Sequence, residues 1–200
     1  MNRNGIEQLI LRNEWEMFQK VQGIDGRAPC QDQYETFVIM RLSQHESMPV
    51  EVLESYLNDL ETAKSAGRNL VMEKYAHMMA QTDPEYYASI RHLLPPITEQ
   101  AKEMAEKITS RYMLWEKEVE ILYPNVRKNG RAAAGVSADG TTSMANYLKC
   151  ELMTYSERTL NLLLRQIEKE PQKNLYRISM EKMARAYGYA SLEAAETALS

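Results

Sequence analysis

The chain of 200 residues has only two cysteines, Cys30 and Cys150, and neither belongs to a paired C-x-x-C motif. This scarcity excludes a zinc site built from cysteines and fits a reducing compartment, so we expect two free thiols. The chain also lacks an apolar run approaching the roughly 20 residues that a membrane span requires. Its N-terminus lacks the apolar region of a signal peptide. These absences predict a cytoplasmic protein that makes no use of a membrane.

Positive charge is in deficit, because 24 lysines and arginines stand against 28 aspartates and glutamates, for a net charge of -4. This balance argues against a general electrostatic attraction to nucleic acid, since phosphate binding depends on a positive surface. The glycine-rich nucleotide motifs are absent. Glu73 and His77 have a spacing that places both side chains on one helix face, but the repeated Glu-x-x-His pairs of a di-iron bundle are missing. We expect no bound metal, and the sequence names no cofactor.

Apolar residues recur at helical spacing along the sequence, and no alternating pattern typical of strands is found. Its apolar spacing, with the proline and glycine breaks, predicts helices at about 4–22, 29–47, 49–67, 70–82, 97–122, 143–168, 176–187 and 191–199, and a short one from Pro84. The fold should be all-α, a compact multi-helix bundle of about seven to nine helices in one domain over residues 1–200. Residues 124–142 show no periodicity and are predicted as a flexible loop.

Two charged residues interrupt the apolar faces of predicted helices. Arg41 shares a face with Tyr34 and Phe37, and Glu151 lies at the centre of another apolar face, close to Tyr155. Since a buried charge is costly unless it is paired, we predict that Arg41 and Glu151 meet between the two helices, together with Tyr155. The pair has two interpretations: an internal salt bridge that fixes how the helices dock, and the polar floor of a ligand pocket.

Three more polar residues, Asn13, Glu14 and Asp59, flank apolar faces in the same manner. Side chains at such margins are usually solvated. The alternative is that they join the network around Arg41.

Three predicted helix starts combine glycine with residues that suit an anion, because unpaired N–H groups at a helix start attract phosphate or carboxylate. The candidate ligand-binding residues at these starts are Arg27, Cys30, Gln31, Arg68, Asn69 and Ser143. The alternative is that each glycine stops a helix and each polar residue caps one. Cys30 also has two interpretations: a thiolate stabilised by the helix start and Arg27, and a small thiol that fills space.

Several motifs are similar to those of a known family. They are Asn13-Glu14-Trp15-Glu16-Met17-Phe18, Gly26-Arg27-Ala28-Pro29-Cys30-Gln31-Asp32, Met40-Arg41-Leu42-Ser43-Gln44, Gly67-Arg68-Asn69-Leu70 and Tyr147-Leu148-Lys149-Cys150-Glu151-Leu152. On these motifs the chain resembles domain of unknown function family 4125, an uncharacterised prokaryotic helical family, over nearly its whole length. The resemblance carries no reaction with it. It implies an association of some members with a nucleotidyltransferase-like domain.

Together these features predict a protein that binds an anionic small molecule in an inter-helix pocket, with enzymatic activity left open. In this hypothesis the loop that carries Arg127, Lys128 and Arg131 closes over the ligand. The candidate catalytic residues are Arg41, Glu151 and Tyr155. The alternative is a protein interaction module that partners a nucleotidyltransferase-like protein.

Overall fold

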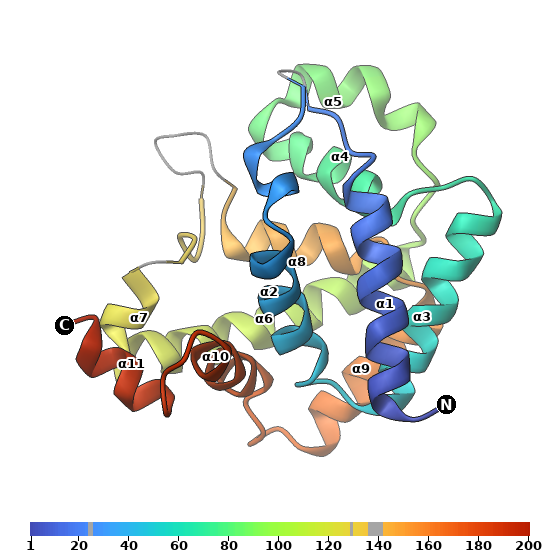
Figure 1. Cartoon of the computed structure of the whole chain (residues 1–200). Coiled ribbons are helices and arrows are strands. Elements are labelled where there is room, and N and C mark those ends of the chain that lie inside the picture. The colour runs from blue at the N-terminus through green and yellow to red at the C-terminus, as the bar shows by residue number, and fades with distance from the viewer. Residues whose placement is uncertain (24–25, 129, 136–141) are drawn as a thin grey trace.

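The computed structural model describes residues 1–23, 26–128, 130–135 and 142–200, and in these ranges it contains α-helices, two short 3-10 helices and no β-strand (Figure 1). The helices are α1 (Arg3–Phe18), η1 (Pro29–Asp32), α2 (Tyr34–His45), α3 (Val50–Ser65), α4 (Leu70–Thr82), α5 (Pro84–Ile90), η2 (Arg91–Leu93), α6 (Glu99–Leu122), α7 (Pro124–Lys128), α8 (Met144–Leu152), α9 (Glu157–Lys169), α10 (Leu175–Ala186) and α11 (Leu192–Ala198). The all-α fold is confirmed. The predicted count of seven to nine is too low, since the described residues contain eleven α-helices.

The two additional helices have local causes. The helix predicted at 143–168 is divided into α8 and α9, because Ser156 takes an extended backbone and its hydroxyl caps α9 by accepting from the Thr159 N–H at 3.3 Å. Helix α7 begins inside the segment predicted as a loop, where Pro124 suits the first helical turn. The prediction of a loop is therefore wrong at its start, and residues 129 and 136–141 lie outside the described residues.

The helix predicted to begin at Pro29 is also corrected. Pro29 opens η1, and α2 begins only at Tyr34 because Gln33 between them has a non-helical backbone, with φ -105° and ψ 67°. The Gln31 side chain holds this turn against the end of α1: its amide donates to the Phe18 carbonyl at 2.7 Å and its oxygen accepts from the Ala28 N–H at 2.8 Å. The thiol of Cys30 consequently lies in a short 3-10 turn rather than at the start of an α-helix.

Two groups of buried apolar side chains hold the helices together, and α6 belongs to both. The larger group gathers side chains such as Ile10, Leu53, Ile108 and Leu160 from α1, α3, α6 and α9. The smaller group joins the end of α6 to α10 and α11 through Val119, Tyr123, Ala184, Leu192 and Ala195. In Figure 1, α6 runs behind α1 and α2 and reaches α7 near the C-terminus.

The packing of the helices places the polar residues. Helix α1 packs on α2, α3 and α4, and α4 packs in turn on α8, so that α1, α2, α4 and α8 enclose one region of the interior. No helix in the described part of the chain is long and apolar enough to cross a membrane.

Candidate functional site

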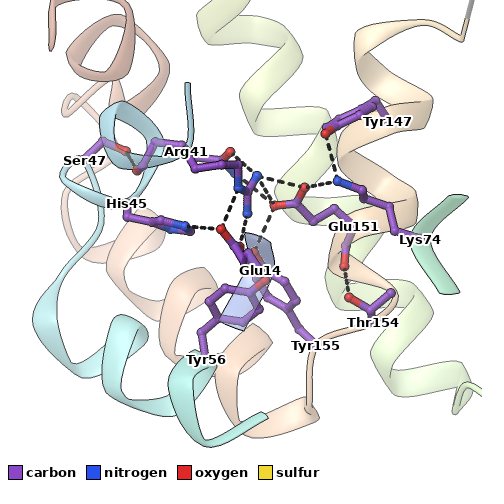
Figure 2. A network of polar contacts seen from close by, with 11 residues as sticks. Glu14, Arg41, His45, Ser47, Tyr56, Lys74, Tyr147, Glu151, Thr154 and Tyr155 are labelled. Carbon is purple, nitrogen blue, oxygen red and sulfur yellow. Dashed lines mark hydrogen bonds and ion pairs between the residues drawn. The ribbon is translucent and has the colours of Figure 1, made fainter. Parts of the chain in front are cut away.

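A buried ion cluster lies where α1, α2, α4 and α8 meet (Figure 2). Arg41 of α2 stands between two carboxylates: its Nε donates to Glu14 Oε2 at 2.9 Å, and its Nη2 donates to Glu14 Oε1. Its Nη1 donates to both carboxylate oxygens of Glu151, each at 3.1 Å. The predicted pairing of Arg41 with Glu151 is therefore confirmed, and Glu14 joins the network rather than facing solvent.

Aromatic and basic side chains complete the cluster. The hydroxyl of Tyr56 donates to Glu14 Oε1 at 2.7 Å, and His45 Nε2 lies 3.0 Å from Glu14 Oε2. The hydroxyl of Tyr155 donates to Glu151 at 3.2 Å, as predicted. Figure 2 shows these rings around the two carboxylates.

Lys74 of α4 is a charged member of the cluster that was not predicted from the sequence. Its Nζ donates to Glu151 Oε2 at 3.3 Å and to the hydroxyl of Tyr147 at 2.8 Å, and the side chain is 7% exposed. A signal was present, because Lys74 lies three residues after Val71 and four before Met78, on the apolar face that these residues define.

The charges of the cluster reinforce one another. Burial alone would raise the pKa of Glu14 and Glu151, but the Arg41 guanidinium holds the pKa of Glu14 well below its usual range. Arg41 and Lys74 together lower the pKa of Glu151 to about 2. Burial raises the pKa of Tyr155 well above its usual range, and the charge of Glu151 adds to this rise. At neutral pH both carboxylates are therefore ionised, while Tyr155 keeps its proton.

A cavity of about 170 Å³ opens beside the cluster. Most of its lining belongs to a charged part, an apolar part and a third group that contains an arginine, two tyrosines and a thiol, and four polar residues complete it: Gln33, Thr36, Tyr56 and Thr154. The charged part is Glu14, Arg41, Lys74 and Glu151, the apolar part is Phe18, Phe37, Met40, Leu70 and Val71, and the third group is Arg131, Tyr75, Tyr147 and Cys30. The cavity therefore offers both charge and apolar surface to one ligand, which is the usual composition of a small-molecule site.

Aromatic rings order the walls of the cavity. Phe18 stacks on Phe37 with ring centroids 5.7 Å apart and 12° between the planes, and on Tyr75 with centroids 6.3 Å apart. The guanidinium of Arg131 lies 4.9 Å from the ring centroid of Tyr147, and Lys74 Nζ lies 4.4 Å from the same centroid. Tyr147 thus holds two cations beside the cavity by cation–π attraction.

The predicted site residues separate into those that line the cavity and those that do not. Arg41 and Glu151 line it, and Tyr155 contacts Glu151 without being part of the lining. Cys30 lines the cavity and is exposed, so the interpretation of this residue as a buried space-filling thiol is wrong.

Arg27 and Gln31 stabilise the turn that contains them and do not line the cavity. The guanidinium of Arg27 pairs with Asp32 at 2.9 Å and also donates to the backbone carbonyl of Gln31. Arg27 also donates to the side chain of Gln19 at the end of α1, so it fixes the turn at 26–32 against that helix and lies outside the cavity lining.

The two other predicted helix starts also lie apart from the cavity lining. Arg68 makes a bidentate ion pair with Glu73, with nitrogen–oxygen distances of 2.9 and 2.7 Å. Asn69 caps α4 by accepting from the Met72 N–H, and Ser143 caps α8 by accepting from the Asn146 N–H. At both helix starts the polar residue is therefore a cap, Asn69 for α4 and Ser143 for α8.

Asn69 should therefore matter for stability. We expect Asn69→Ala to lower the free energy of unfolding by about 1–2 kcal/mol, because it removes the cap of α4 and the hydrogen bond from the Asn69 amide to the Met17 carbonyl at 2.8 Å. Urea unfolding measures the loss. Asn58→Ala, at an exposed position inside α3, is the control and should change the stability by no more than about 0.5 kcal/mol. Equal stability of the two variants would contradict the capping role.

The basic residues of the predicted loop do not act as a unit. Arg127 is buried in α7 against Glu116 of α6, with which it forms an ion pair, so it cannot close over a ligand. Lys128 is exposed and donates to Asn125 Oδ1 at 2.9 Å. Arg131 is the residue of this group that lines the cavity.

The pair Glu73 and His77, predicted to share one helix face, is buried in α4. Burial lowers the pKa of His77, and the hydroxyl of Tyr87 lies 3.5 Å from its Nδ1. Among the described residues, no three side chains of histidine, cysteine, aspartate or glutamate form a group that could hold a metal ion. Asp59 lies away from the cluster, where it accepts hydrogen bonds from Ser156, the N-cap of α9, and from Thr159 in the first turn of that helix.

Fold and site define an all-α protein with a cavity beside a buried ion cluster. The chain belongs to the family described as protein of unknown function (DUF4125), whose model matches residues 4–197. The match confirms the resemblance and covers every residue of the cluster and of the cavity lining. No curated protein and no solved structure matches the chain.

Proposed function

We propose that this protein binds an anionic small molecule in the cavity between α1, α2, α4 and α8. The observation that carries the proposal is the balance of charge on the described lining. Two carboxylates, Glu14 and Glu151, face three cations, Arg41, Lys74 and Arg131, so one positive charge is in excess. An anion that enters the cavity would neutralise this charge where part of the surrounding water has been displaced, which strengthens the attraction.

The arginine that supplies the excess charge is free to act on a ligand. Among the described residues, the hydrogen-bond partner of Arg131 is the Thr142 carbonyl, 3.3 Å from Nη1, and no carboxylate pairs with it. A guanidinium has five N–H donors, which leaves a fork for an incoming anion. Arg41, by contrast, already donates to Glu14, Glu151 and Gln44.

The ionisation of the cluster favours binding over proton transfer. A general acid or base works best with a pKa near the working pH. The pKa of Glu151 is held at about 2, and that of Tyr155 is raised well above its usual range. We therefore assign Arg41 and Glu151 to the floor of the cavity, and Tyr155 to holding Glu151 in place from outside the lining.

A thermal-shift screen tests the proposal. The panel contains nucleotides, phosphorylated metabolites and carboxylates, each measured against the wild-type protein, Arg131→Ala and Arg111→Ala. A ligand at 100 times its dissociation constant stabilises the wild type by about 2.7 kcal/mol. If Arg131→Ala weakens binding tenfold, the stabilisation falls to about half of that value.

Arg111→Ala is a matched control, because Arg111 also lies over an aromatic ring, 5.8 Å from Trp115, but outside the cavity lining. Ligand shifts in this variant should equal those of the wild type when each is measured from its own midpoint. A panel without anionic hits, or hits that Arg131→Ala leaves unchanged, would overturn the proposal.

A further inference from the structure

The size of the excess charge restricts the ligand. With Glu14 and Glu151 ionised and Arg41 and Lys74 protonated, the described lining carries a single net positive charge, that of Arg131. A carboxylate brings one negative charge and neutralises it. A phosphate monoester near pH 7 brings about two and would leave a net negative charge beside Glu151. Charge balance thus favours a monoanion.

The volume of the cavity sets a second limit. Cavities that bind drug-sized ligands measure roughly 300–1,000 Å³, whereas an apolar cavity of about 150 Å³ is known to accept benzene. The cavity here measures about 170 Å³. It therefore has room for one six-membered ring with a small substituent.

The shape of the apolar wall sets a third limit on the ligand. Phe18, Phe37 and Tyr75 present rings that lie within 24° of parallel for each stacked pair, and Met40 and Val71 add flexible and branched apolar surface. Flat rings beside one another form a wall on which a planar ligand makes more contact than a puckered one.

From these three limits we propose that the cavity takes a single-ring aromatic carboxylate, with its ring against Phe18 and Phe37 and its carboxylate on the guanidinium of Arg131. This inference rests on the proposed function and narrows it to one class of ligand. The planar carboxylate matches the guanidinium fork, which a lysine in place of Arg131 could not reproduce.

Cys30 provides a reporter inside the site. Its thiol is exposed and lines the cavity, so a bound ligand shields it from a thiol reagent. The second thiol, Cys150, is buried, and burial raises its pKa to about 11, which keeps it unreactive in the folded protein. Dithiodipyridine is a suitable reagent, because it is uncharged and does not itself compete for Arg131.

The experiment measures the rate at which dithiodipyridine modifies Cys30 in the presence of benzoate, phenyl phosphate, benzyl alcohol or cyclohexanecarboxylate. We expect benzoate to protect Cys30 at concentrations about tenfold lower than any of the other three. In Arg131→Ala the advantage of benzoate over benzyl alcohol should disappear, because the loss of a charged hydrogen bond weakens binding about tenfold or more. Arg111→Ala should behave as the wild type.

Two outcomes overturn the inference and leave the proposed function standing. The first is stronger protection of Cys30 by phenyl phosphate than by benzoate. The second is that none of the four compounds protects Cys30, although the thermal-shift panel contains an anionic ligand whose binding is weakened in Arg131→Ala. If all four compounds and the whole panel fail while Cys30 reacts at a normal rate, both the inference and the proposed function are wrong.

Discussion

Replacement of Arg41 by alanine is expected to lower the free energy of unfolding by about 3–5 kcal/mol, the cost of leaving buried charge without its partner. Glu14 and Glu151 are 2% and 3% exposed, and Arg41 makes hydrogen bonds to both of them. Without the guanidinium the two carboxylates face one another in the interior. For a chain of 200 residues the loss corresponds to a fall in Tm of roughly 6–20 °C, which calorimetry or urea unfolding measures.

The control is Arg12→Ala. Arg12 pairs with Glu16 on the surface of α1, where its side chain is 75% exposed, and such pairs contribute at most about 1 kcal/mol. Arg41→Lys should fall between the two, since a lysine keeps the charge but cannot serve both carboxylates through a planar fork. A loss below about 1 kcal/mol in Arg41→Ala would mean that the cluster does not hold the helices together.

The second large effect is a loss of stability in acid. The pKa of Glu151 falls from an ordinary value of 4.5 to about 2 in the folded protein, so folding favours the ionised form. The resulting stabilisation is fully present above pH 4.5 and is lost as the pH falls toward 2. We expect Glu151 alone to account for about 3 kcal/mol of this loss. Glu14, whose pKa is also lowered, adds to it.

Urea unfolding of the wild type and Glu151→Gln between pH 7 and pH 2 tests this expectation. The variant is less stable at pH 7, and its stability changes less steeply below pH 4.5, because the amide does not titrate. Glu99→Gln is the control, since the Glu99 side chain is 83% exposed, and its curve should run parallel to that of the wild type. Parallel curves for Glu151→Gln and the wild type would show that the carboxylate titrates normally in the folded state.

The central ion pair was predictable because its residues sit inside regular helices. Arg41 and Glu151 each occupy the apolar face of a helix, and the cost of burying either charge alone required a partner of opposite sign. Lys74 occupies the same kind of position on the apolar face of α4, so the same argument would have predicted a buried partner of opposite charge for it.

The turns were harder to predict, because they depend on hydrogen bonds between side chains and backbone groups. The apolar periodicity of the sequence does not record such bonds. Apolar residues continue through Met153 and Tyr155, so the pattern reads as one helix from α8 into α9. The break arises where the Thr154 hydroxyl bonds to the Glu151 carbonyl and Ser156 caps the next helix. Similarly, the 3-10 turn η1 depends on Gln31 reaching the Phe18 carbonyl, a contact across thirteen residues.

The charged members of the cluster come from α1, α2, α4 and α8, and α8 is synthesised long after the other three. Glu14, Arg41 and Lys74 emerge from the ribosome long before Glu151, which lies 110 residues after Arg41. Until α8 is made, the nascent chain carries two cations, Arg41 and Lys74, for the single carboxylate of Glu14. The complete cluster can therefore form only after α8 has been synthesised, and until then the excess positive charge has no partner in the interior.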